Sequence, residues 1–288
     1  MELTLIAQRE GRLSGFLRGE LQMSSGLMNR LKWGDSITVN GLPCHTDYPV
    51  QPGDTIRVRL DEPAAEYPAE PGPLKILYED EHILIVDKPA GMLIHPSRSQ
   101  NSGTLANRVL AHYQATSQRS AFHPVTRLDR DTFGIVLLAK NSHIHSLLQT
   151  KPIRKTYHAL TFGGPAEASG IIDAPIDRRP LPSLLRFIGP DGKPSLTEYS
   201  VLERDSMLCK LSLHPITGRT HQLRLHCAHM GWPILGDPQY NTPESVVFSK
   251  QFSLNSQILC AKRLEFIHPI TEQAISVESA MDATLPAL

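Results

Sequence analysis

The densest run of polar side chains stands directly before an apolar stretch. Residues 123–134 read His-Pro-Val-Thr-Arg-Leu-Asp-Arg-Asp-Thr-Phe-Gly, and the apolar run 135–138 follows at once. A polar loop that leads into a buried strand holds its side chains at the edge of a sheet, where catalytic groups often lie. Asp129 stands between Arg127 and Arg130, and a nearby guanidinium keeps a carboxylate ionised. The run predicts a catalytic carboxylate, while a structural ion-paired turn fits the same residues.

A second polar run covers residues 214–226, with Gly236 and Asp237 beyond it. We expect a helix over 219–230 after Thr217-Gly218, with Leu223, Cys227 and Met230 on one apolar face. Its N-terminus would favour a phosphate or a carboxylate, and Arg224 could pair with Asp129. His221, His226 and His229 are five and three residues apart, which spreads them around a helix, and no carboxylate completes a ligand set. The spacing therefore argues against a metal site.

Two shorter stretches carry one candidate each. Tyr157 follows the basic pair Arg154-Lys155 and could stack on a base, while an ordinary half-buried strand tyrosine fits equally well. Lys88 ends the apolar strand 83–86 in a turn that contains proline and glycine. That position favours a structural lysine over a catalytic one.

Composition limits the class of protein. The chain has 288 residues, 40% of them hydrophobic and 20% charged, which suits one large globular domain or a small domain and a larger one. Its 23 prolines disfavour an all-helical bundle. Four scattered cysteines without a Cys-x-x-Cys pair predict reduced thiols. Apolar runs such as 135–139 are far shorter than the ~20 residues that span a bilayer, so we expect a cytoplasmic protein without a membrane partner.

The charges balance overall but not locally. The formal net charge is zero, with 29 basic and 29 acidic residues, so the chain as a whole is not strongly basic. Residues 119–155 nevertheless contain seven basic and two acidic residues, and residues 178–224 contain eight and four. One face could therefore bind a polyanion, although a solvated, salt-bridged surface is at least as compatible with any single charge.

The pattern of apolar residues divides the chain into two parts. We expect two helices within 12–18 and 26–32, followed by strands at 36–41 and 53–60. Four prolines lie between Asp61 and Pro73. These features predict a small domain over 1–62, a linker over 63–73 and a larger domain over 74–288.

The larger part is predicted to combine helices and strands. We expect helices near 105–112, 142–149 and 219–230. The expected strands are 83–86, 134–139, 156–162, 197–202, 208–213, 258–266 and 274–277. This alternation favours an α+β fold with a dominant sheet.

In this order and spacing, the four stretches resemble RNA pseudouridine synthases of the ribosomal large-subunit synthase A type. The resemblance covers about residues 74–270, and Arg127-Leu128-Asp129 with Thr132 and Gly134 is its most specific part. It implies a mixed, largely antiparallel sheet and the conversion of uridine to pseudouridine in structured RNA, more commonly rRNA than tRNA. Residues 12–60 are similar to the small RNA-binding domain named after a ribosomal protein of the small subunit.

The resemblance also implies roles for individual residues. Asp129 stands at the position of the catalytic aspartate, Tyr157 at that of the active-site tyrosine, and Arg224 at that of the arginine that pairs with the aspartate. The RNA-binding positions that we expect are Arg127, Arg130, Lys155, Arg219, Arg18, Arg30 and Lys32. The chain has Thr126 where the family commonly has histidine and Phe133 where it has serine, which affects the fine contacts around a flipped base.

The implied reaction gains and loses no atoms, and it needs no metal, redox partner or other cofactor. One carboxylate suffices, either by covalent attack on the ribose or base or by removal of a sugar proton. We expect a monomer that acts on RNA. Two other functions remain open at this stage: a non-catalytic RNA-binding or ribosome-assembly protein, and a glycosidic-bond hydrolase that uses Asp131 as a second carboxylate.

Overall fold

The computed structural model describes residues 1–62, 67–97, 100–180, 183 and 185–284. Part of the expected linker, residues 63–66, lies outside the described residues. The part from Tyr67 to Pro73 has no regular element but is tied to the larger body of the protein. The backbone N–H of Glu70 donates to Asn107 O at 2.9 Å, and Asn107 Nδ2 donates to Pro68 O at 2.8 Å.

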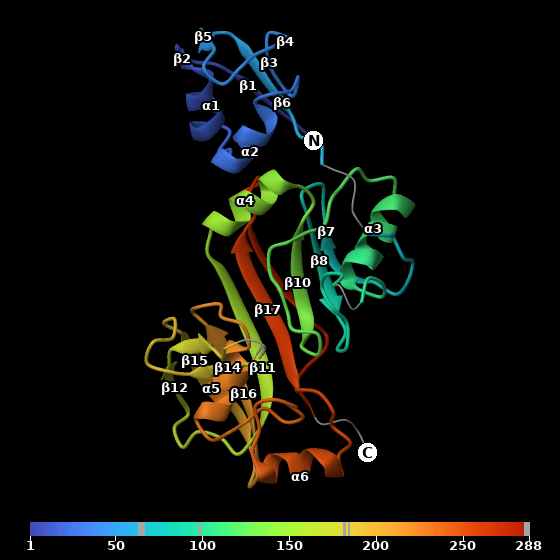
Figure 1. Ribbon diagram of the computed structural model, residues 1–288, viewed down its shortest axis with the longest axis vertical. Coiled ribbons are helices and arrows are strands. Elements are labelled where there is room, and N and C mark those ends of the chain that lie inside the picture. The colour runs from blue at the N-terminus through green and yellow to red at the C-terminus, as the bar shows by residue number, and fades with distance from the viewer. Residues whose placement is uncertain (63–66, 98–99, 181–182, 184, 285–288) are drawn as a thin grey trace.

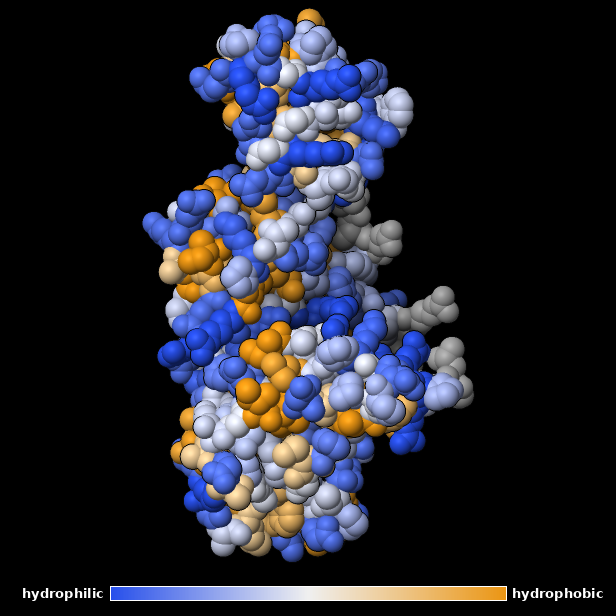
Figure 2. All heavy atoms as spheres, turned by 90° about the vertical axis from the view of Figure 1, so that its left-hand side faces the viewer, coloured by the Kyte–Doolittle hydropathy of each residue, from blue (hydrophilic) through white to orange (hydrophobic). Residues whose placement is uncertain are grey.

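The N-terminal unit has its own sheet and its own core. Its sheet has the order β1-β6-β3-β4, and the strands are β1 (Glu2–Ile6), β6 (Thr55–Arg59), β3 (Ile37–Val39) and β4 (Leu42–Pro43). Two further short strands, β2 (Gly11–Arg12) and β5 (Pro49–Val50), pair with each other. Helices α1 (Leu13–Gly19) and α2 (Ser25–Leu31) bury Phe16, Leu17 and Leu27 against Ile37 and Ile56. The unit forms a separate lobe at one end of an elongated molecule (Figures 1 and 2).

The larger body is built on one ten-stranded sheet. The main path of strands runs β12-β15-β16-β11-β17-β10-β8-β7, with β18 beside β17 and β9 beside β10. In chain order the strands are β7 (Lys75–Glu79), β8 (Ile83–Lys88), β9 (His123–Pro124), β10 (Phe133–Ala139), β11 (Ile153–Phe162), β12 (Ser169–Asp173), β15 (Leu196–Arg204), β16 (Leu208–Pro215), β17 (Leu259–Ile267) and β18 (Ala274–Glu278). Strands β10 and β17 pair in parallel, and the other described pairs are antiparallel. The expected α+β class with a mixed, largely antiparallel sheet is confirmed.

Alternating side chains of the central strands bury both faces of this sheet. Successive residues of a strand point to opposite faces. Leu84 and Val86 of β8 accordingly pack in the cluster under helix α3 (Leu105–Ala115), while Ile83 and Ile85 pack in a second cluster with α4 (Ser142–Thr150). Figure 1 shows α3 beside β7 and β8, and α4 between the sheet and the N-terminal unit.

The remaining elements surround β16 and β17. A short hairpin of β13 (Ile176–Arg178) and β14 (Arg186–Ile188) lies near α5 (Gln222–His229), and α6 (Pro243–Gln251) lies at the end of the molecule opposite the N-terminal unit (Figure 1). No helix in the described part of the chain combines the length and the apolar character needed to cross a bilayer.

Several elements lie outside the expected ones. The sequence pattern did not predict α6 or the strands β1, β2, β4, β5, β7, β9, β12, β13 and β14, and β1 lies within the expected small domain over 1–62. The helix expected over 219–230 begins three residues later, at Gln222, because His221 has a left-handed backbone (φ 57°) that no α-helix continues. Met230, expected on one apolar face with Leu223 and Cys227, follows the last helical residue and is 44% exposed, so that part of the expectation is wrong.

Candidate active site

A cavity of about 700 Å³ lies where the loop before β10 meets β11 and the segment 215–224. Seven of the ten expected site residues line it: Asp129, Tyr157, Arg224, Arg127, Arg130, Lys155 and Arg219. Arg18 and Arg30 belong to α1 and α2 of the N-terminal unit, Lys32 directly follows α2, and none of the three lines this cavity. The structure thus brings together residues that are up to 97 positions apart in the sequence.

The loop that carries Asp129 is fixed from both sides. Lys88 is fully buried and its Nζ donates to Arg130 O at 2.8 Å and to Met92 O at 2.9 Å, so it joins its own turn to the loop. The expected structural role of Lys88 fits these contacts. Burial lowers its pKa to about 8, against the opposing effect of Asp131 and Asp129.

On the other side, hydroxyl groups attach the loop to the sheet. Thr126 Oγ1 accepts a hydrogen bond from Leu137 N at 2.9 Å, and Thr132 Oγ1 accepts one from Gln257 Nε2 at 3.2 Å. Thr126, which departs from the family pattern, therefore contributes to the attachment of the loop to β10. Phe133, the second departure, is half-buried against the apolar cluster that contains Phe248.

Gly134 allows β10 to lie directly against β17. Its φ is +107°, and a Cβ atom at this position would overlap the backbone of Ala261, its partner in the parallel pair. Glycine is the residue without this steric conflict. The short polar loop therefore ends at a position that fixes the distance between two central strands.

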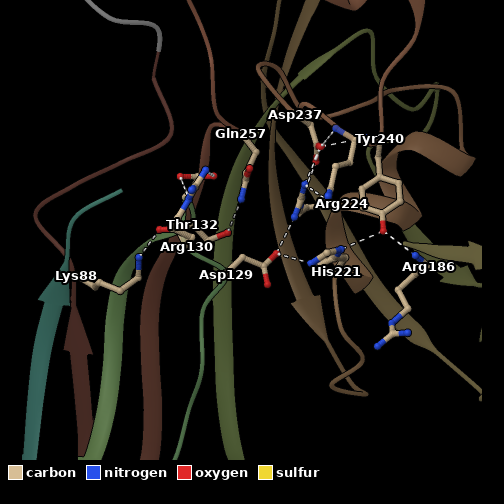
Figure 3. Close-up of polar contacts among 12 residues, drawn as sticks. Lys88, Asp129, Arg130, Thr132, Arg186, His221, Arg224, Asp237, Tyr240 and Gln257 are labelled. Atoms are coloured by element: carbon tan, nitrogen blue, oxygen red, sulfur yellow. Dashed lines mark hydrogen bonds and ion pairs between the residues drawn. The ribbon is translucent and has the colours of Figure 1, made fainter. Parts of the chain in front are cut away.

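Arg224 is the centre of the charged network (Figure 3). It is 4% exposed, and its Nε donates to Asp237 Oδ2 at 2.6 Å while its Nη2 donates to Asp237 Oδ1 at 2.8 Å. Its Nη1 donates to Asp129 Oδ2 at 3.0 Å. Burial alone lowers the pKa of Arg224, but Asp237 and Asp129 outweigh that effect and raise the pKa above the usual range. The guanidinium is thus permanently charged and directed at Asp129.

Asp129 keeps one carboxylate oxygen free. Its side chain is 30% exposed, and Oδ2 receives the bond from Arg224. In the part of the chain that the structure describes, Oδ1 has no hydrogen-bond partner. Figure 3 shows that the second oxygen of Asp129 points away from Arg224, and Asp129 is one of the residues that line the cavity. The arrangement supplies an oriented anionic oxygen to whatever the cavity binds.

Tyr157 forms part of the cavity wall from strand β11. It follows a register shift between Thr156 and Tyr157 in the pairing of β11 with β17. Its ring is half-buried, and burial, followed by the charge of Asp129, raises the pKa of its hydroxyl above the usual range. Tyr157 is therefore a neutral aromatic surface next to the carboxylate.

Asp237, Gln239 and Tyr240 also belong to the site, although the sequence pattern did not reveal their roles. Asp237 is fully buried at its side chain and also accepts hydrogen bonds from the backbone N–H groups of Gln239 and Tyr240. A chemical argument could have indicated a second acidic partner. A buried arginine needs hydrogen-bond acceptors for all its N–H groups, and Asp129 alone does not provide enough of them.

The histidines do not form one cluster. His221 lies beside Asp129, with 3.8 Å between Nε2 and Oδ2. His226 is buried and bonds to Thr197 Oγ1 and Ala174 O, while His229 is exposed. His226 is therefore a core residue with both ring nitrogens in hydrogen bonds.

Comparison with known proteins identifies the family. The family model described as RNA pseudouridylate synthase matches residues 82–229. The chain belongs to this family. An uncharacterised RNA pseudouridine synthase of Bacillus subtilis (strain 168) is 37% identical over 262 residues, which cover 88% of this chain and 90% of that protein.

Other members of the RNA pseudouridylate synthase family are similarly close. Ribosomal large subunit pseudouridine synthase C of Vibrio cholerae is 30% identical over 95% of this chain and 90% of its own length. Among solved structures, human RNA pseudouridylate synthase domain containing 1 matches with a TM-score of 0.59 and 27% identity over 74% of this chain and 86% of that chain. The protein is thus an RNA pseudouridine synthase, an isomerase, and the fold of its larger body is that of the family.

Proposed function

We propose that this protein isomerises uridines to pseudouridine in structured rRNA, with Asp129 as the catalytic carboxylate. The observation that carries the proposal is the state of Asp129: one oxygen is held by Arg224 and the other faces a cavity of about 700 Å³. Cavities of this size accommodate small organic groups such as a single nucleotide. The narrower assignment to the large-subunit synthase A type rests on the four motifs around Lys88, Asp129, Tyr157 and Arg224.

The reaction breaks the bond between N1 of uracil and C1′ of ribose, turns the base and joins C5 to C1′, while C5 loses its proton and N1 gains one. The free oxygen of Asp129 is suited either to covalent attack or to removal of a sugar proton. Arg224 orients the carboxylate through its hydrogen bond to Oδ2, and Asp237 holds Arg224 in place. Tyr157 offers its ring to the face of the uracil.

The target base must leave its stack to reach Asp129. Enzymes that act on a base extrude it from the stack, and protein side chains can fill the space that it leaves. Arg127 and Arg130 are exposed at the rim of the cavity, and Arg219 is exposed on the opposite segment. These cations suit the phosphates on either side of a flipped nucleotide.

The N-terminal unit provides a second RNA-binding surface in this proposal. Arg18 and Lys32 have no acidic partner among the described residues, and Lys32 Nζ lies 5.1 Å from the ring centroid of Trp33, which is 78% exposed. Arg30 differs, because its Nη2 donates to Ser142 Oγ at 2.7 Å and its charge also faces Glu62. The support for rRNA is that three of the relatives are named as ribosomal large subunit synthases. We propose a cytoplasmic monomer.

The test is the variant Asp129→Ala. Total rRNA from cells that lack the protein is incubated with wild-type or variant enzyme, and pseudouridine is mapped by carbodiimide modification and primer extension. We expect the wild type to modify defined uridines and Asp129→Ala to modify none above background, with RNA binding retained. Undiminished product from Asp129→Ala would remove Asp129 from its role.

Asp131→Asn is the matched control. Asp131 is two residues away, and both of its carboxylate oxygens bond to Arg130, at 3.2 and 3.3 Å. We expect this variant to keep activity within a few-fold. If the wild-type enzyme released free uracil and Asp131→Asn lost that activity, a hydrolase that uses two carboxylates would be supported instead.

A further inference from the structure

His221 occupies an unusual backbone position beside the catalytic carboxylate. Its φ of 57° and ψ of 20° are left-handed, a conformation that costs a non-glycine residue about 1–2 kcal/mol. Strained backbone of this kind persists where the surroundings determine it and is common at active sites. Figure 3 shows the consequence: the imidazole lies between Asp129 and Tyr240.

The contacts of Tyr240 are compatible with a neutral imidazole that carries its proton on Nε2. The Tyr240 hydroxyl oxygen accepts the backbone N–H of Arg186 at 3.0 Å and lies 3.0 Å from His221 Nδ1. Because that oxygen already accepts one hydrogen bond, its own proton is free to be donated to Nδ1. The proton of a neutral imidazole is then on Nε2.

The side of the ring that faces Asp129 leads to the same tautomer. Nε2 is 3.8 Å from Asp129 Oδ2. A lone pair on Nε2 would face the carboxylate and be repelled, whereas an N–H is attracted to it. Burial lowers the pKa of His221, which favours the neutral ring, and Asp129 opposes this while Arg224 adds to it. Asp237 and Arg186 are the other charged groups that act on the ring.

The Nε2–H group is oriented but not used by the protein. A distance of 3.8 Å exceeds the 2.7–3.2 Å of an N–H···O hydrogen bond. Oδ2 is already bonded to Arg224, and the histidine side chain retains 18% exposure in the cavity wall. The cavity therefore contains a fixed donor next to the catalytic carboxylate, and a bound ligand can accept from it.

We propose that His221 is a catalytic hydrogen-bond donor whose Nε2–H binds a carbonyl oxygen of the target uracil. The inference rests on the proposed function. When the bond between N1 and C1′ breaks, its electron pair goes to the ring, and the negative charge spreads onto the carbonyl oxygens. A donor on one of these oxygens becomes stronger as the charge develops. His221 keeps its proton throughout, so the role holds whether Asp129 attacks covalently or removes a sugar proton.

His221→Gln and His221→Asn test the effect of the donor position, because both place an amide N–H at residue 221 but at different distances from the backbone. In His221→Gln the amide nitrogen reaches approximately to the position of Nε2, and in His221→Asn it reaches only to that of Nδ1. Asparagine tolerates the left-handed backbone well, so a loss in that variant is not a loss of backbone conformation. Thermal melting of each variant checks that the fold is intact.

Single-turnover rate constants on an rRNA fragment that contains the mapped uridine provide the readout. We expect His221→Asn and His221→Ala to lower the rate constant at saturating RNA by about 10- to 100-fold, which is the effect of removing a hydrogen bond to a charged acceptor. His221→Gln should lie within about tenfold of the wild type and above His221→Asn, and the affinity for RNA should change little in all three.

Three outcomes decide the inference. The inference is supported if the single-turnover rate constant is highest for the wild type, lower for His221→Gln and lowest for His221→Asn. Wild-type rates in His221→Asn, or equal losses in the Gln and Asn variants, overturn it because the reach of the donor then has no effect. The proposed function fails in a different way, namely if the wild-type enzyme itself forms no pseudouridine.

Discussion

The active site and the N-terminal unit hold their charged side chains in opposite ways. Arg224 and Asp237 have side chains that are 5% and 0% exposed, and two hydrogen bonds join them. In the N-terminal unit, the pair Arg9–Glu20 has exposures of 58% and 36%. A buried charge that loses its partner is costly, whereas a surface pair contributes about 0–1 kcal/mol. The buried pair thus holds one geometry, whereas the surface pair in the N-terminal unit stays open to solvent, as the proposed contact with a polyanion requires.

The largest expected effect is from removal of the buried partner of Arg224. In Asp237→Ala the guanidinium loses two hydrogen bonds and retains Asp129 as its one acidic partner among the described residues. We expect the free energy of unfolding, measured by urea denaturation, to fall by about 3–5 kcal/mol. Pseudouridine formation should fall as well, because Arg224 no longer has a fixed direction.

Glu20→Ala provides the comparison from the N-terminal unit. It breaks the exposed pair with Arg9, so the expected loss is at most about 1 kcal/mol. Similar losses for Asp237→Ala and Glu20→Ala would show that the burial of the Arg224 network has no energetic consequence.

A pair of glycines compares backbone packing in the two regions. Gly134 and Gly41 both have positive φ, +107° and +81°, but a Cβ at Gly41 meets nothing within 4 Å while one at Gly134 overlaps Ala261. Gly41→Ala should cost about 1–2 kcal/mol for the backbone alone. Gly134→Ala adds the forced separation of β10 and β17, for a total of about 2–5 kcal/mol. Equal changes in thermal melting would contradict the close approach of these strands.

The sequence predicted the parts of this molecule that depend on local pattern. The run that contains Asp129 stood out because polar residues lead into an apolar strand, and charge compensation suggested Arg224 as its partner. Helices such as α3 and α4 followed from apolar spacing, and the structure adds side-chain caps at Thr104 and Asn141 that the sequence analysis did not use. Apart from the pairing of Arg224 with Asp129, these signals lie within short stretches of the chain.

What the sequence did not predict depends on contacts between distant segments. The roles of Asp237 and Tyr240 depend on their contacts with Arg224 and His221. No periodic pattern in the sequence indicates that these residues lie close together. The left-handed backbone of His221, which delays the start of α5, has no local residue signal as strong as a glycine. Helix α6 lacks an apolar stripe, although Thr242 as its cap and Pro243 as its first residue were available signals.

Glu62 joins the N-terminal unit to the larger body, and its contacts should make the free energy of unfolding depend on pH. It accepts hydrogen bonds from Ser142 N and Oγ at 2.7 and 2.8 Å and contacts His123 Nε2 at 3.0 Å. Burial raises the pKa of Glu62, but these bonds outweigh it and lower the pKa to about 2 from the usual 4.5. A depressed carboxyl pKa stabilises the folded state above the unfolded value and ceases to do so as the pH falls toward the folded value.

We therefore expect Glu62→Gln to lower the free energy of unfolding by up to about 3 kcal/mol at neutral pH. The difference from wild type should shrink between pH 4.5 and about 2, as urea denaturation at several pH values would show. Asp61→Asn is the control, because the neighbouring carboxylate is 67% exposed and pairs with Arg59 at the surface. A difference that does not vary with pH would argue against the ionised Glu62 as the link.

The smallest expected effect concerns RNA affinity at the N-terminal unit. Trp33 is 78% exposed, with Lys32 above its ring and the edge of His45 at 5.7 Å between centroids. Stacking of a base on an aromatic ring contributes ~1–3 kcal/mol. We expect Trp33→Ala to weaken binding of an rRNA fragment by roughly fivefold, the low end of that range, because the ring is open to water.

The controls separate stacking from general loss of apolar surface. Trp33→Phe keeps an aromatic ring and should retain most of the affinity, whereas Leu42→Ala removes another exposed apolar side chain, 70% exposed, and should have no effect. The second tryptophan, Trp232, is 5% exposed, so quenching of tryptophan emission by RNA in the wild type should vanish in Trp33→Ala. If quenching persists in that variant, RNA does not contact Trp33, and the accessible cations of this unit bind without an aromatic platform.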